Sequence, residues 1–174
     1  LGDDDLLSNG AIGHYLSFIQ ENPGLDFISS RIKLKYKDGS IRVIGRPWAW
    51  AQFRRYMNVA HVGSLHHHTL FQRYGSFDSD LKICGDYEFL LRSRNHLKAG
   101  FIDNILIQMT AGGISNSTAA AIWETFHVKR KLRSASEFEA VVDCAEAYLK
   151  WLFRRLVRVA VRSFPSIHSP SKSS

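Results

Sequence analysis

The sequence predicts an α/β fold, in which strands and helices follow one another along the chain. Two kinds of pattern lead to this prediction: some segments alternate apolar and polar residues, as half-buried strands do, and others repeat apolar residues every three or four positions, as helices do. Hydrophobic residues make up 45% of the 174 residues, which is typical of a globular chain that can bury a core.

The first predicted helix follows an acidic loop. Ser8 or Asn9 can cap this helix, and the Asn-Pro-Gly sequence at 22–24 would end it. The apolar residues at helical spacing on it are Ile12, Tyr15, Leu16 and Ile19.

A β-hairpin is predicted next, over residues 25–45. Apolar residues alternate on both sides of the sequence Lys-Asp-Gly-Ser at 37–40, and a glycine in such a position favours a tight turn. Helical character returns in the Trp-rich stretch 47–57, which leads into a short apolar segment at 59–63.

The middle of the chain contains two predicted helices and a strand. Residues 67–74 have a helical pattern that Gly75 would close, and Asp86 would begin a second helix. Residues 100–109 have the pattern of a strand.

The C-terminal part is predicted to be a helical extension over residues 118–164, with helices at 117–133 and 136–163. The Ser- and Pro-rich residues 165–174 are predicted to be a disordered tail. The last helix has a basic amphipathic pattern, because cationic residues recur every four positions among apolar ones. Its segment 146–163 could lie on an anionic membrane surface, or it could pack against the rest of the chain with a solvated basic face.

The charge distribution and the cysteine content argue against some classes of function and indicate a cellular compartment. The net charge of +7 could suggest a nucleic-acid partner, but the excess lies mainly between 129 and 162 while 78–86 is acidic, so nucleic-acid binding is not expected. Cys84 and Cys144 form no metal-binding or disulfide pattern, which favours a reducing, cytoplasmic compartment. The sequence shows neither a secretion signal nor a membrane-spanning run.

Two acidic motifs carry the chemistry: LGDDDLL at 1–7 and ICGDYEFLLR at 83–92. Carboxylate oxygens are the ligands that Mg²⁺ or Mn²⁺ prefers, and a separate carboxylate at a helix N-terminus tends to stay ionised and can act as a base.

These motifs, with residues 60–78 (AHVGSLHHHTLFQRYGSFD) and 112–116 (GGISN), resemble family-2 inverting glycosyltransferases of the GT-A fold, particularly those that build bacterial capsule, O-antigen and colanic-acid-type polysaccharides. The resemblance extends from Leu1 to about Ser117. It implies a metal- and acceptor-binding portion, over 1–117, of a GT-A domain whose initial nucleotide-binding strands are absent. It also implies a nucleotide-sugar donor, a saccharide or lipid-linked acceptor, and transfer with inversion.

The resemblance assigns a DxD-type motif to the acidic loop, whose carboxylates would hold the donor diphosphate through Mg²⁺ or Mn²⁺. Asp3 and Asp5 have the literal spacing for the metal, whereas the closest subfamily pattern emphasises Asp4 and Asp5. Asp86 would be the catalytic base. The alternatives are a solvated acidic helix cap for the loop and a plain N-cap for Asp86.

The resemblance also suggests acceptor-side roles for His61 and Gly113, while Trp48 could stack on a sugar and Arg92 could bind a carboxylate or phosphate. The respective alternatives are a hydrogen-bonded structural histidine, ordinary loop chemistry, core packing and a surface ion pair. A zinc site at 66–68 is not expected, because three consecutive histidines on a helix point in different directions.

Two functions follow from these observations. The chain is expected to belong to an inverting glycosyltransferase of cell-surface polysaccharide synthesis that acts in the cytoplasm, or peripherally at the inner face of the membrane. The alternative is a catalytically inactive, truncated glycosyltransferase that serves as an interaction or membrane-association module.

Overall fold

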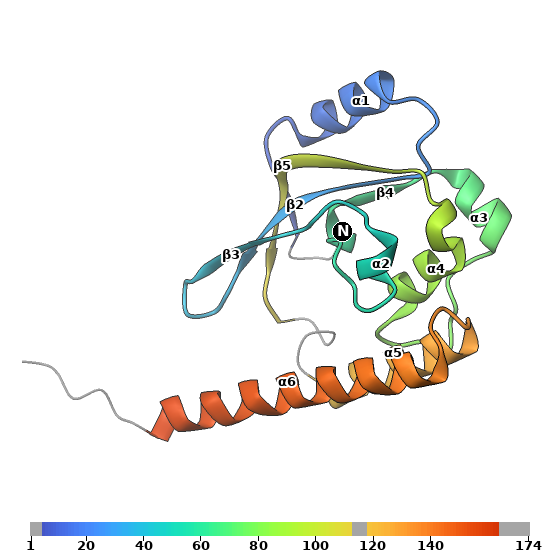
Figure 1. Cartoon of the computed structure of the whole chain (residues 1–174). Coiled ribbons are helices and arrows are strands. Elements are labelled where there is room, and N and C mark those ends of the chain that lie inside the picture. The colour runs from blue at the N-terminus through green and yellow to red at the C-terminus, as the bar shows by residue number, and fades with distance from the viewer. Residues whose placement is uncertain (1–4, 113–117, 164–174) are drawn as a thin grey trace, which may run out of the picture.

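The computed structural model describes residues 5–112 and 118–163, and these form an α/β structure with an open, mixed sheet (Figure 1). The α/β class predicted from the sequence is therefore confirmed. The helix α1 lies on one side of the sheet, and α2, α4, α5 and α6 lie on the other. The long helix α6 runs along the edge of the molecule farthest from α1.

The sheet is built around two long parallel strands, β2 (Phe27–Lys35) and β5 (Ala99–Thr110). Three short strands pair antiparallel to them: β1 (Leu6–Leu7) with β5, and β3 (Ile41–Ile44) and β4 (Ser64–His66) with successive parts of β2. The chain between β2 and β5 contains helices, which is what a parallel pair requires.

The predicted hairpin is confirmed, because β2 and β3 pair from Lys35 and Ile41 outward with Gly39 at a φ of 83° in the turn. The strand predicted at 100–109 is confirmed as β5. The sequence did not predict β1 and β4, which have two and three residues and exist through their pairing with β5 and β2.

Most predicted helices are present with nearly the expected bounds. They are α1 (Ala11–Glu21), α3 (His68–Tyr74), α4 (Gly85–Ser93), α5 (Ala119–Lys131) and α6 (Glu137–Ser163). In the Trp-rich stretch only α2 (Trp50–Phe53) is helical, and the apolar segment at 59–63 ends in the 3₁₀ turn η1 (His61–Gly63). A second 3₁₀ turn, η2 (Arg94–His96), follows α4.

The helix α1 differs from its prediction in two respects. Its N-cap is Gly10, at a φ of 76°, while the Ser8 side chain instead donates to the Ile105 carbonyl. Its buried residues are Ala11 and Tyr15. The other apolar residues of the predicted face, Ile12, Leu16 and Ile19, are exposed.

Two apolar clusters hold the elements together. Ile28 packs with Tyr15 of α1, whereas its neighbour Phe27 packs with Phe53 of α2 and Phe89 of α4. Successive side chains of a strand point to opposite faces, so β2 contributes to both clusters. None of the described helices is both long enough and apolar enough to cross a membrane.

Candidate functional site

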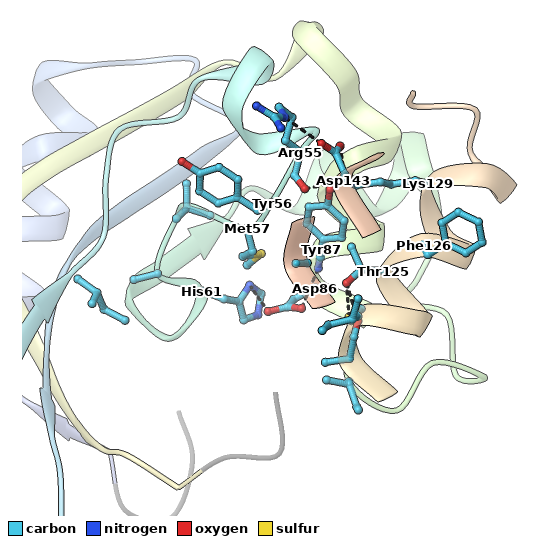
Figure 2. Close-up of a pocket in the computed structure, with 18 of the residues that line it drawn as sticks. Arg55, Tyr56, Met57, His61, Asp86, Tyr87, Thr125, Phe126, Lys129 and Asp143 are labelled. Atoms are coloured by element: carbon cyan, nitrogen blue, oxygen red, sulfur yellow. Dashed lines mark hydrogen bonds and ion pairs between the residues drawn. The ribbon is translucent and has the colours of Figure 1, made fainter. Parts of the chain in front are cut away.

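A cavity of about 450 Å³ lies between the loop that leads into η1, the N-terminus of α4, and the C-terminal helices α5 and α6 (Figure 2). Apolar residues of the sheet, such as Ile32, Ile44 and Met109, form part of its wall. The polar and ionisable residues that line it are Arg55, Tyr56, His61, Cys84, Asp86, Tyr87, Thr125, Lys129, Asp143 and Cys144.

Asp86 and His61 face each other at this cavity (Figure 2). The Oδ2 atom of Asp86 lies 3.9 Å from Nδ1 of His61, and the Asp86 side chain is 31% exposed. Its Oδ1 atom accepts a hydrogen bond of 2.8 Å from the Tyr87 N–H. Two residues that the sequence singled out separately, 25 positions apart, therefore meet in one cavity.

Asp86 is not the N-cap of α4. The helix begins at Gly85, the capping position is Cys84, and Asp86 lies in the first helical turn. The helix dipole favours a negative charge in that turn. The plain N-cap alternative for Asp86 is therefore wrong.

Glu124 of α5 supplies the capping oxygens instead. Its carboxylate accepts hydrogen bonds from the N–H groups of Lys82, Ile83 and Cys84 at 3.0, 2.8 and 2.6 Å. Burial alone would raise the pKa of Glu124, but these three donors hold it below its usual range. The sequence gives no sign of this role, because Glu124 lies about 40 residues away from the groups it binds.

The imidazole of His61 is neutral at neutral pH. Burial lowers its pKa, although the charge of Asp86 acts in the opposite direction. Its buried Nδ1 atom has no hydrogen-bond partner among the described residues. This geometry differs from that of a hydrogen-bonded structural histidine, because the buried ring nitrogen makes no hydrogen bond within these residues.

His66 lies directly behind His61, with their ring centroids 5.3 Å apart. Burial, and then the proximity of His61, lowers the pKa of His66 to about 4. His66 packs against aromatic rings of α3, α4 and β2, namely Phe71, Phe89 and Phe27. It therefore supports the His61 ring as a neutral, packed neighbour.

The far end of the cavity contains a buried ion pair that the sequence did not predict. Nζ of Lys129 donates to Oδ2 of Asp143 at 2.8 Å and to the Arg55 carbonyl at 2.6 Å. Arg55 also pairs with Asp143, at 2.9 Å. These residues come from α5, α6 and the segment after α2, so only the tertiary packing brings them together.

Arg92 and Trp48 do not line the cavity. Arg92 pairs with Glu88, which is 1% exposed, and donates to the carbonyls of Tyr74 and Ser76. This contact is a buried ion pair that anchors the loop after α3, so the surface-pair alternative is wrong. Trp48 is partly buried, with its ring centroid 4.3 Å from that of Phe53.

Three of the predicted site residues, Asp3, Asp4 and Gly113, lie outside the described residues. Asp5 is described. It directly precedes Leu6, which pairs with Gln108, and the next residue of β5, Met109, lines the cavity. Asp5 therefore lies where the sheet meets the cavity.

Within residues 5–112 and 118–163, no group of three or more His, Cys, Asp or Glu side chains is arranged to hold a metal ion. Of the predicted acidic loop only Asp5 is among these residues, so the metal site stays a prediction. Comparison of the chain with models of protein families and with curated proteins found no match.

Proposed function

We propose that this chain carries the acceptor side and part of the donor side of an inverting glycosyltransferase of the GT-A type. The observation that carries this proposal is the pairing of Asp86 with the neutral His61 at a largely apolar cavity, where the buried Nδ1 of His61 has no hydrogen-bond partner within residues 5–112 and 118–163. A partly exposed carboxylate beside an available imidazole is suited to bind a hydroxyl group and remove its proton.

In the proposed reaction, Asp86 acts on an acceptor hydroxyl. Its carboxylate takes the proton while the hydroxyl oxygen attacks the anomeric carbon of a nucleoside-diphosphate sugar. The bond from that carbon to the diphosphate breaks, and its electron pair leaves with the phosphate oxygen. Because attack and departure occur on opposite faces in one displacement, the anomeric configuration inverts.

The separation of Asp86 and His61 fits such a hydroxyl group. An oxygen about 2.8 Å from each of two atoms can lie between them when those atoms are 3.9 Å apart. The hydroxyl would then donate to Asp86 and accept from the Nδ1–H tautomer of His61. Two hydrogen bonds would orient the attacking oxygen, which is the positioning that lowers the barrier of a displacement.

The donor diphosphate is proposed to lie beside Asp5, which directly precedes β1. Asp5, with Asp3 or Asp4, would hold Mg²⁺ or Mn²⁺, and the bound cation would stabilise the charge on the leaving diphosphate. The carboxylate chemistry of Asp5 fits such a cation. Its position one residue before β1 leaves it close to Met109 in the cavity wall.

The experiment that tests this proposal is isothermal titration of UDP-, GDP- and dTDP-sugars into the chain, with and without Mn²⁺. We expect binding of one nucleotide class that requires the metal and is abolished by Asp5→Ala. Hydrolysis of the bound donor by water should then fall by roughly 10²–10⁴-fold in Asp86→Asn, because water replaces the acceptor and needs the same base.

The matched control is Asp80→Asn, which removes a carboxylate from an exposed position in the loop before α4. It should leave both binding and hydrolysis unchanged, and Asp86→Asn should retain donor binding. The absence of metal-dependent binding to any of the three donor classes would contradict the proposal. Equal hydrolysis rates in Asp86→Asn and Asp80→Asn would remove Asp86 as the base.

A further inference from the structure

The outward face of α6 is a continuous apolar stripe. Its large apolar side chains are 38–79% exposed to solvent. They are Phe138, Val141, Val142, Tyr148, Leu149, Leu152, Phe153 and Leu156. The opposite face of the helix carries Ala140, Asp143 and Ala147, which line the cavity.

The stripe follows helical geometry. Its members follow the helical repeat of about 3.6 residues, so they share one side of the helix from Phe138 to Leu156, a length of roughly 28 Å. Figure 1 shows the second half of α6 extending past the other helices, on the side of the molecule where the β2–β3 hairpin ends. Exposed apolar surface of this extent marks a surface that binds another protein or a membrane.

The two halves of α6 differ in charge. The acidic residues of the first half pair with cations of the body or of α6 itself: Glu139 with Arg54, Asp143 with Lys129, and Glu146 with Arg55 and Lys150. Glu137 pairs with Arg130 in the same way. The first half is therefore already neutralised within the fold.

The second half of α6 is cationic, with Lys150, Arg154, Arg155, Arg158 and Arg162. No carboxylate among the described residues forms an ion pair with Arg154 or Arg155; Arg154 donates to the Lys150 carbonyl, and Arg155 lies over the Trp151 ring. Lys150 pairs with Glu146, so among the described residues Arg154 and Arg155 are the cations of this half without a matching anion.

We propose that α6 is an interfacial helix that lies in the surface of an anionic lipid bilayer, with its apolar stripe toward the acyl chains. Such helices combine an apolar face with Lys and Arg on the polar face, and anionic headgroups supply the missing counter-charge. Two copies of α6 fit less well. A parallel pair would bring the cationic halves together, and an antiparallel pair would set them against carboxylates that the fold already uses.

This arrangement places the cavity directly above the lipid. The stripe and the cavity lie on opposite faces of α6, and a helix with its side chains is about 10 Å thick. Under the proposed function, the acceptor would then be a lipid-linked saccharide. Its reacting hydroxyl would lie about one helix diameter above the lipid headgroups. That consequence rests on the proposed function, whereas membrane binding by α6 does not.

The test is cosedimentation of the full chain with vesicles of phosphatidylcholine alone and with vesicles that contain about equal parts of phosphatidylcholine and phosphatidylglycerol. We expect strong partitioning to the anionic vesicles only. Replacing Lys150, Arg154 and Arg155 by Gln should weaken it about a hundredfold, because each cation near the surface contributes roughly fivefold. The triple variant Leu149→Gln, Phe153→Gln, Leu156→Gln should weaken it at least tenfold.

The matched control is the triple variant Ile12→Gln, Leu16→Gln, Ile19→Gln, which removes three exposed apolar residues from α1 on the other side of the sheet (Figure 1). It should bind vesicles as the unmodified chain does. Circular dichroism and thermal unfolding would verify that all variants fold. Because the substituted residues are exposed, folding should persist.

Three results would overturn the proposal. The first is equal partitioning to neutral and anionic vesicles, and the second is an equal loss of binding in the α1 and α6 variants. The third is a dimer in size-exclusion chromatography that the α6 apolar variant dissociates, with no vesicle binding by the unmodified chain. In that case a second copy, not lipid, would cover the stripe. None of these measurements uses sugar transfer, so they are independent of the proposed function.

Discussion

At the residue scale, the candidate site depends on pH because the two partly buried imidazoles, His61 and His66, are neutral at neutral pH. His61 and His66 both have lowered pKa values because burial disfavours their charged forms. A protonated His61 would carry a positive charge and hold Asp86 in an ion pair, so the carboxylate would be a weaker base. We therefore expect the site to be ready for an acceptor only when both rings are neutral.

A stability measurement can detect the burial of His66. Its pKa is 6.5 in the unfolded chain and about 4 in the folded one. As pH falls through 6.5, His66 binds a proton in the unfolded chain but not in the folded chain. The free energy of unfolding therefore decreases until about pH 4, where the folded chain is protonated as well. We expect a loss of about 1.5 kcal/mol from this ring between about pH 7.5 and pH 5, after allowance for its partial exposure.

Urea unfolding at the two pH values would measure this loss. In His66→Phe the pH dependence should shrink by that amount, because a phenyl ring fits the aromatic surroundings and does not titrate. His68→Gln, at an exposed position, is the control and should keep the full dependence. An unchanged pH dependence in His66→Phe would mean that His66 titrates normally in the folded chain.

At the scale of elements, α5 determines how α4 begins. Glu124 satisfies three backbone N–H groups just before and at the capping position of α4. This contact holds the first turn of α4, and with it Asp86, in place from outside the helix. The C-terminal helices are therefore part of the construction of the candidate site.

We expect Glu124→Ala to lower the free energy of unfolding by about 2 kcal/mol, because three N–H groups lose charge-assisted hydrogen bonds and water replaces them only in part. Amide hydrogen exchange at Ile83 and Cys84 should speed up in this variant. Glu137→Ala removes a carboxylate from an exposed ion pair with Arg130, and should cost less than 1 kcal/mol. Equal effects of the two substitutions would contradict the capping role.

At the scale of the whole molecule, a buried ion cluster joins the C-terminal helices to the body. Lys129 of α5 is 3% exposed and contacts both Asp143 of α6 and the Arg55 carbonyl. Removal of one member of a buried pair leaves the other charge without full compensation. The position of α6, and so the orientation of its apolar stripe, depends on this cluster.

We predict that Lys129→Met lowers the free energy of unfolding by roughly 3 kcal/mol. The matched control on the same helix is Lys131→Met, which breaks the pair with Asp78. That lysine is 63% exposed, so the change should stay below about 1 kcal/mol. Urea unfolding of both variants would compare them, and a Lys129→Met variant as stable as Lys131→Met would show that the cluster is dispensable.

The sequence by itself determined the elements that depend on local signals. The hairpin around Gly39, the helix that Gly75 ends, the strand β5 and the two C-terminal helices follow from periodicity and from glycine positions, which act over a few residues. The sequence also identified Asp86 and His61 as candidate functional residues.

Only the tertiary structure decided the rest, because it depends on which distant segments touch. The strands β1 and β4 are too short to have a pattern of their own and exist through their partners. Periodicity showed that α1 is amphipathic but not which residues the sheet would cover, so Tyr15 is buried and Leu16 is exposed. The meeting of His61 with Asp86, the cap from Glu124 and the Lys129–Asp143 pair join side chains from different elements, and local sequence patterns carry no information about such contacts.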